Sequence, residues 1–230
     1  MLQHIPKLFN EQELCEVHNL IAQATWYDGR ASAGTLAAKT KNNVQMVPNS
    51  DAAQALRAMV QTARDKSDAF TAIALPKKLS HLGFNRYSQT DTGPEFYGPH
   101  VDNAVRFSNE HGQRVRTDIS CTLFLSEPQS YEGGELAIQN GLVEQRVKLA
   151  AGDMILYPST SIHQVTPVLK GTRLACFFWV ESMIRSNEQR SLLLDLDNAI
   201  RSLRSKHGDS AEVLTLNTTY HNLLRQWADS

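Results

Sequence analysis

The chain has 230 residues, of which 41% are hydrophobic and 20% are charged, and its formal net charge is -1. These values are ordinary for a soluble globular protein, and they give no reason to expect nucleic acid or a membrane as a partner. The N-terminal residues lack the basic and apolar regions of a secretory signal, and the three widely spaced cysteines form no disulfide framework. The composition therefore favours a reducing, cytoplasmic setting.

The N-terminal third of the chain is predicted to be rich in helix. Asn10 and Glu13 have the spacing of a capping box, and apolar residues then recur at helical intervals. A second helix is expected to begin near Ser50 and to include Phe70 on its apolar stripe. One or two short strands are expected within residues 39–47.

The middle of the chain changes character, because short apolar runs of strand length alternate there with turn signals. The expected strands are 79–87, 117–125, 134–139, 145–149, 153–157 and 173–180. Many short strands without a long helix between them indicate an antiparallel sandwich or barrel. The segment Tyr131–Leu136, which contains two adjacent glycines, is interpreted as a tight hairpin turn.

The end of the chain is helical again, with a break at Gly208. We therefore predict a mainly β protein with flanking helices: helical support in residues 1–76, a β core in residues 77–182 and a helical subdomain in residues 183–230. The apolar stripe that includes Leu192 is expected to be covered. Either the tail helices pack within one chain, or part of their surface is shared with a second copy; we favour the second arrangement, a homodimer.

The β core contains a candidate metal site. His100 and Asp102 are two residues apart, so their side chains project from the same face of an extended strand. His163, which follows a later strand and turn, adds a second imidazole. Two histidines and one carboxylate form the facial triad that binds non-haem iron(II) and leaves three coordination positions open. We therefore predict an iron(II) site at these residues.

Arg173 lies ten positions after His163 and opens an apolar strand. A guanidinium in a core strand is costly unless it is paired, and its planar fork suits a carboxylate. One explanation is a structural ion pair with an acidic residue of the protein. The other, which the triad favours, is a dicarboxylate such as 2-oxoglutarate that chelates the metal at one end and meets Arg173 at the other.

Five motifs stand in order across the β core. They are Phe84-Asn85-Arg86-Tyr87, His100-Val101-Asp102-Asn103, Tyr131-Glu132-Gly133-Gly134-Glu135-Leu136, Ala151-Gly152-Asp153-Met154-Ile155-Leu156-Tyr157-Pro158, and His163 followed by Gly171-Thr172-Arg173. With these motifs the chain resembles the iron(II)- and 2-oxoglutarate-dependent dioxygenases, specifically the bacterial PKHD-type hydroxylases, whose core is similar to that of prolyl hydroxylases. The helical tail also resembles that subfamily.

The resemblance implies a distorted double-stranded β-helix, or jelly roll, with iron ligated by His100, Asp102 and His163. It also implies that Arg173 anchors 2-oxoglutarate and that Tyr87 lines the cosubstrate pocket. The implied activity is hydroxylation of an unactivated C–H bond with O₂, with release of succinate and CO₂, and with ascorbate as the reductant that restores oxidised iron. The substrate, a protein side chain or a small molecule, does not follow from the resemblance.

Two other functions remain open on the sequence alone. A cupin-like metalloenzyme without a cosubstrate would share the β core and the metal, but it has no use for Arg173. A non-catalytic module that senses iron or 2-oxoglutarate would need the same residues as the enzyme. The polar segment Asn103–Arg116, directly after the triad, is either a lid over the substrate or a solvated connection.

Overall fold

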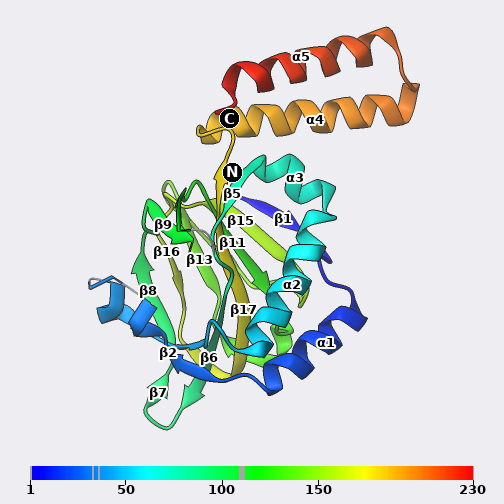
Figure 1. The fold of residues 1–230 in the computed structure, drawn as a ribbon. Coiled ribbons are helices and arrows are strands. Elements are labelled where there is room, and N and C mark those ends of the chain that lie inside the picture. The colour runs from blue at the N-terminus through cyan, green and yellow to red at the C-terminus, as the bar shows by residue number, and fades with distance from the viewer. Residues whose placement is uncertain (1, 33, 36, 109–111, 230) are drawn as a thin grey trace.

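The computed structural model of the chain describes residues 2–32, 34–35, 37–108 and 112–229. Two antiparallel sheets form its centre (Figure 1). The larger sheet has the order β1 (Gln3–Ile5), β15 (Met154–Pro158), β11 (Ile119–Phe124), β17 (Val168–Ser182), β6 (Gly83–Thr90), β4 (Val44–Met46) and β2 (Trp26–Asp28). The smaller sheet has the order β14 (Val143–Val147), β13 (Leu136–Asn140), β16 (His163–Val165), β8 (Phe96–His100) and β3 (Lys41–Asn42).

Shorter pairings complete the sheets. β5 (Pro76–Leu79) and β12 (Tyr131–Gly133) pair with β17, and β7 (Gly93–Pro94) pairs with β6. β9 (Val105–Ser108) and β10 (Gln113–Arg116) form a separate hairpin. This arrangement of antiparallel sheets with flanking helices is the jelly roll that the sequence resemblance implied.

The N-terminal helices α1 (Glu11–Ala22), α2 (Asp51–Asp65) and α3 (Asp68–Ala74) lie along the larger sheet (Figure 1). The capping box of α1 is confirmed, since the Asn10 side chain accepts from the Glu13 amide and the Glu13 carboxylate accepts from the Asn10 amide. The single helix expected after Ser50 is instead two helices. The Ser67 hydroxyl accepts a hydrogen bond from the Phe70 amide at 3.1 Å and caps α3, which ends the preceding helix.

Most of the expected strands are present within a few residues, and the short strands expected in residues 39–47 are β3 and β4. The expected strand 79–87 is divided into β5 and β6, and β17 is much longer than the run 173–180. The extra length of β17 is stabilised by pairing, because it contacts β5, β6, β11 and β12 along its course.

The interpretation of Tyr131–Leu136 as a hairpin turn is wrong. β12 pairs with β17 in one layer, whereas β13 pairs with β14 and β16 in the other, so the two flanking strands never pair with each other. Gly133 and Gly134 have φ values of 71° and 65°, and a Cβ on Gly133 would lie 2.0 Å from the carbonyl oxygen of Pro167. The glycines therefore carry the chain between the two sheets rather than around a hairpin.

Alternation along β11 separates the core from the site. On β11, Ile119, Cys121 and Leu123 belong to the apolar cluster shared with the helices, and Ser120 and Thr122 line a pocket on the opposite face. Both buried cysteines, as expected, serve as small apolar side chains in the reduced form. The pocket lies between the two sheets and receives side chains from both.

The C-terminal helices α4 (Asn187–His207) and α5 (Ala211–Trp227) form a hairpin that extends away from the sheets (Figure 1). Leu193, Tyr220 and Leu223 belong to the apolar cluster between these helices and the end of α3. Leu192 is 59% exposed and Leu214 is 67% exposed, so packing within the chain leaves part of the apolar surface of these helices uncovered. No helix in the described part of the chain is long and apolar enough to cross a membrane.

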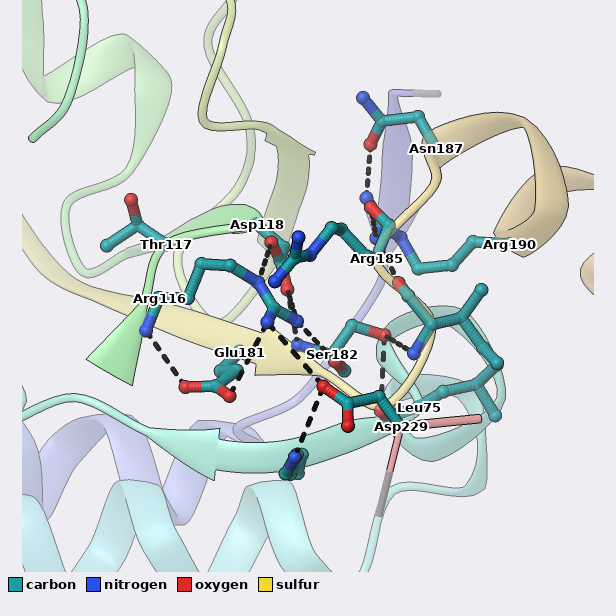
Figure 2. A network of polar contacts seen from close by, with 12 residues as sticks. Leu75, Arg116, Thr117, Asp118, Glu181, Ser182, Arg185, Asn187, Arg190 and Asp229 are labelled. Carbon is teal, nitrogen blue, oxygen red and sulfur yellow. Dashed lines mark hydrogen bonds and ion pairs between the residues drawn. The ribbon is translucent and has the colours of Figure 1, made fainter. Parts of the chain in front are cut away.

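A polar network fastens this hairpin to the core (Figure 2). The Arg116 guanidinium donates to both carboxylate oxygens of Asp118 at 2.8 and 3.0 Å, and it also faces the carboxylates of Glu181 and Asp229. The Asp229 amide donates to the carbonyl of Met183 at 2.8 Å, so the end of the chain is tied to the segment that leads into α4. Arg116 is therefore the common partner of three acidic residues at this junction.

We expect Arg116→Met to loosen the C-terminal hairpin and to lower stability by about 1–3 kcal/mol, because the largely buried carboxylates of Asp118 and Glu181 lose a charged partner. The measurement is thermal unfolding combined with limited proteolysis between the core and α4. Arg201→Met is the matched control, since Arg201 forms only an exposed pair with Asp197 within α4 and should cost about 0.5 kcal/mol or less. Equal effects of the two variants would contradict a fastening role for Arg116.

Candidate metal centre

The two predicted histidines face each other across a strand pair of the smaller sheet. His100 ends β8 and His163 begins β16, and the antiparallel register places them directly opposite. Asp102 lies two residues after the end of β8, so it is not on the same strand as His100, contrary to the expectation from the sequence. One ligand atom from each of His100, Asp102 and His163 lies within 4.8 Å of the others, and no second group of this kind occurs among the described residues. The structure thus brings together the three residues that the sequence selected.

Backbone contacts orient both imidazoles. Nδ1 of His100 lies 2.8 Å from the carbonyl oxygen of Gly98, and Nδ1 of His163 lies 3.1 Å from that of Ser161. A carbonyl only accepts, so each Nδ1 carries a proton, and the free lone pair of the neutral form of each ring is then on Nε2. Burial and the neighbouring His163 lower the pKa of His100 to about 4, so its ring is neutral at neutral pH. Neutral, oriented imidazoles are the form that ligates a metal.

The carboxylate of the group accepts a hydrogen bond from Ser120 on β11, and Ser120 in turn contacts Ser159 in the turn after β15. The Ser120 hydroxyl donates to Oδ2 of Asp102 at 2.6 Å, and Ser120 and Ser159 lie 2.8 Å apart. The same carboxylate oxygen is 3.6 Å from Nε2 of His163, so the two atoms are close enough to bind the same metal ion. Asp102 is therefore positioned by a neighbouring hydroxyl rather than left to solvent.

Arg173 lies deeper in the pocket and is 1% exposed. Its strand neighbour in the β6–β17 register is Tyr87, and its guanidinium lies 5.5 Å from the Tyr87 ring and 5.2 Å from the Phe124 ring. Nε and Nη1 of Arg173 have no hydrogen-bond partner within the described structure. None of the described carboxylates forms an ion pair with it either, so a structural ion pair does not explain this residue.

A buried cation with free N–H groups fits an anion that comes from outside the protein. Leaving such a group unpaired in a dry site costs free energy, whereas a bound carboxylate supplies the missing acceptors. Tyr87 is 1% exposed and burial raises the pKa of its hydroxyl, which therefore remains a neutral donor. The buried Tyr131 hydroxyl was not selected from the sequence; burial raises its pKa, and the neighbouring Arg173 guanidinium opposes that rise.

Other residues of the pocket were also missed from the sequence. They include Lys41, Tyr97, Ser120, Tyr157 and Trp179. The alternation Ile119-Ser120-Cys121-Thr122-Leu123 was a usable signal for Ser120, because small polar residues at every second position mark a face that is not part of the apolar core. Lys41 carried no such signal, since its place depends on the pairing of the two-residue strand β3 with β8.

The comparisons with known proteins agree with this fold and site. Residues 82–181 match the model of the 2OG-Fe(II) oxygenase superfamily, which defines the class of the protein. Residues 187–229 match the model of the PKHD-type hydroxylase C-terminal domain. A PKHD-type hydroxylase from Polaromonas sp. is 51% identical over 230 residues and covers all of both chains, and PKHD-type hydroxylase YbiX from Escherichia coli is 47% identical over 229 residues with the same coverage. The chain belongs to the PKHD-type hydroxylase family.

Solved structures show the same fold at much lower sequence identity. A prolyl hydroxylase from Trichoplax adhaerens, in complex with a peptide fragment of hypoxia inducible factor, is 16% identical, with a TM-score of 0.56 over 83% of this chain and 86% of that chain. At this identity the likeness shows the jelly-roll fold alone. The family establishes an oxidoreductase that uses iron(II) and 2-oxoglutarate.

Proposed function

We propose that this protein hydroxylates an unactivated C–H bond of its substrate, with 2-oxoglutarate and O₂ consumed and succinate and CO₂ released. In this proposal His100, Asp102 and His163 hold the iron(II), and Arg173 and Tyr87 hold the far carboxylate of 2-oxoglutarate. The observation that carries it is the buried guanidinium of Arg173, which lines the same pocket as the triad and has no ion-pair partner among the described carboxylates.

Iron(II) with its three open positions would supply the oxidative chemistry once 2-oxoglutarate and O₂ are present. The residues of the chain have other tasks. His100 and His163 present lone pairs from rings fixed by backbone carbonyls, and Ser120 keeps the Asp102 carboxylate in place. Phe177 and Trp179 line the same pocket and limit the entry of water.

The proposal is tested by measuring succinate in anaerobically iron-loaded protein after O₂ is admitted, with and without a fractionated cell extract. Succinate that depends on iron(II) and 2-oxoglutarate and rises with one fraction supports the hydroxylase and gives a route to the substrate. A cupin-like enzyme would act on a fraction without consuming 2-oxoglutarate. A sensing module would bind both ligands and release no succinate under any fraction.

The contact between Ser120 and Asp102 gives a prediction about metal affinity. Ser120→Ala removes the hydroxyl that donates to Asp102 at 2.6 Å, and loss of such a supporting hydrogen bond typically weakens metal binding about 10- to 100-fold. The measurement is an iron(II) titration without O₂. Ser130→Ala, which removes an exposed hydroxyl that donates to the Glu127 carbonyl, is the control. A Ser120→Ala protein with the affinity of the parent would show that Asp102 needs no support.

We also propose a homodimer through α4 and α5. Its support is the exposure of Leu192 on α4 and of Leu214 on α5, since burial of a leucine side chain is favourable by about 1.5–3 kcal/mol. We expect sedimentation of the full chain at micromolar concentration to give a dimer, and Leu192→Glu with Leu214→Glu to give a monomer with an unchanged metal site. A parent chain that sediments as a monomer rules the dimer out.

Three further expectations remain proposals. Residues 1–76, 77–182 and 183–230 act as support, catalytic core and helical subdomain. Ascorbate serves as the reductant, which is tested by the number of turnovers in its presence and absence. A reducing, cytoplasmic setting suits the three free cysteines and a ferrous centre.

A further inference from the structure

Two cationic side chains line the pocket without a role in holding iron or 2-oxoglutarate. They are Lys41 on β3 and Arg106 on β9. Lys41 is 7% exposed; its ammonium donates to the Ser32 hydroxyl at 2.9 Å and lies 5.1 Å from the centre of the Tyr97 ring. Tyr97 in turn stacks on His100, with ring centres 3.6 Å apart. Lys41 is therefore buried one ring away from a proposed metal ligand.

Arg106 reaches the pocket from a different element, the strand β9. On β9 its neighbours Val105 and Phe107 are 50% and 65% exposed, and alternation along the strand turns Arg106 the other way. Its guanidinium lies 4.0 Å from the centre of the Trp179 ring, the distance of a cation–π contact. The segment Asn103–Arg116, expected as a lid or a connection, is thus a hairpin that contributes a cation to the pocket; residues 109–111 lie outside the described residues.

The charges of the pocket do not balance. Asp102 is the one carboxylate among the described lining residues, and it is taken up by the metal in the proposed function. The double charge of 2-oxoglutarate offsets Arg173 and the charge that remains on the metal centre. The charges of Lys41 and Arg106 are then left without a counterpart in the pocket itself, while Asp28, which is not a lining residue, acts on Lys41 from outside it. Burial and the charge of Arg106 lower the pKa of Lys41 to about 8. The Lys41 ammonium therefore still carries its charge at neutral pH, close enough to Arg106 to be affected by it.

We propose that the substrate carries an oxyanion group, a carboxylate or a phosphate, that binds between Lys41 and Arg106. This inference rests on the proposed function, because it assigns to the two cations the part of the pocket that iron and 2-oxoglutarate leave open. The ammonium of Lys41 and the Arg106 guanidinium, which stacks on Trp179, supply N–H donors from two different strands. The C–H bond to be oxidised then lies in the same molecule, close to its anionic group.

The alternative is that the two cations only stabilise the negative charge of Asp102, which interacts electrostatically with both of them. The two roles make different predictions. If the cations stabilise the Asp102 carboxylate, replacing either of them should change the affinity for iron(II). Cations that bind substrate would leave iron(II) affinity within a few-fold and change the affinity for anions.

The experiment uses protein loaded with iron(II) and saturating 2-oxoglutarate without O₂, so that Arg173 is already occupied. The probes are matched pairs, aromatic and aliphatic carboxylates against their amides and phosphate monoesters against their alcohols, with acetate and inorganic phosphate as the smallest anions. Binding is followed by tryptophan fluorescence, since Trp179 lies under Arg106, and by thermal shift. The variants are Lys41→Met and Arg106→Met, with exposed Lys39→Met and Arg114→Met as controls.

We expect anions to bind at least tenfold more tightly than their neutral partners, and each pocket variant to weaken this binding about 10- to 100-fold. The preferred class of probe distinguishes a carboxylate from a phosphate. Equal binding of charged and neutral partners, no anion binding up to millimolar concentration, or parent-like anion binding in both pocket variants would overturn the inference. Any of these results in a protein that still releases succinate would leave the proposed function intact, whereas failure of iron or 2-oxoglutarate binding would overturn the proposed function itself.

Discussion

Arg173→Ala is expected to raise the concentration of 2-oxoglutarate needed for half-saturation by about 10- to 150-fold, while iron(II) still binds. A hydrogen bond to a charged group contributes about 1.5–3 kcal/mol, and every 1.4 kcal/mol corresponds to about a tenfold change in affinity. Arg173→Lys should lie between the parent and Arg173→Ala, because a point charge replaces the planar fork. The measurement is a titration of 2-oxoglutarate into iron-loaded protein without O₂.

The burial of Arg173 leads to a second expected effect, on the thermal stability of the protein: removal of the guanidinium should not destabilise the ligand-free form. Without ligand the guanidinium is a buried cation with no ion-pair partner among the described residues, so Arg173→Met should keep or raise the melting temperature of the ligand-free protein. The stabilisation by 2-oxoglutarate should then disappear. Lys170→Met, on the same strand but exposed, is the control. An unchanged requirement for 2-oxoglutarate in Arg173→Ala would make Arg173 a structural residue.

Removal of a metal ligand is expected to have the largest effect of any substitution. His163→Ala and Asp102→Ala should each weaken iron(II) affinity by more than about 100-fold, which is the upper effect of losing a supporting hydrogen bond. Succinate release should fall to background. Protein for this test is stripped of metal first, because sites of nitrogen and oxygen ligands bind cobalt, nickel and copper more tightly than iron(II). Metal content and succinate are measured together.

A matched control is available on the helical tail. His207 is exposed near the end of α4 and belongs to no group of metal-ligating residues in the described chain, so His207→Ala should behave as the parent. Full iron-dependent turnover in either His163→Ala or Asp102→Ala would show that the triad is wrongly assigned.

The grouping of the three candidate ligands was predictable from the sequence because most of it is local. His100 ends β8 and Asp102 lies two residues further on, outside the strand, so the short spacing in the sequence alone keeps them close and only the position of His163 depends on the fold. Arg173 was predictable because an arginine in an apolar strand is costly and therefore conspicuous. Its strand partner Tyr87 followed from the family resemblance and not from any local pattern.

The contributions of residues far apart in the chain could not be predicted in the same way. Lys41 reaches the pocket through a two-residue strand, and its neighbours there come from β8 and β9. The glycine pair at 133–134 shows a second limit: positive φ was foreseen, but local sequence does not say whether a turn joins paired strands or two different sheets. The break at Ser67 shows a third, since one serine hydroxyl ended a helix whose apolar spacing continued.

The most direct test of the central claim is a crystal structure of the protein grown with iron(II) and 2-oxoglutarate in the absence of O₂. The account predicts one metal ion bound by His100, Asp102 and His163, chelated by the 2-oxo acid end of the cosubstrate, with the far carboxylate on the Arg173 guanidinium. A metal bound elsewhere, or a cosubstrate whose far carboxylate does not contact Arg173, would contradict it.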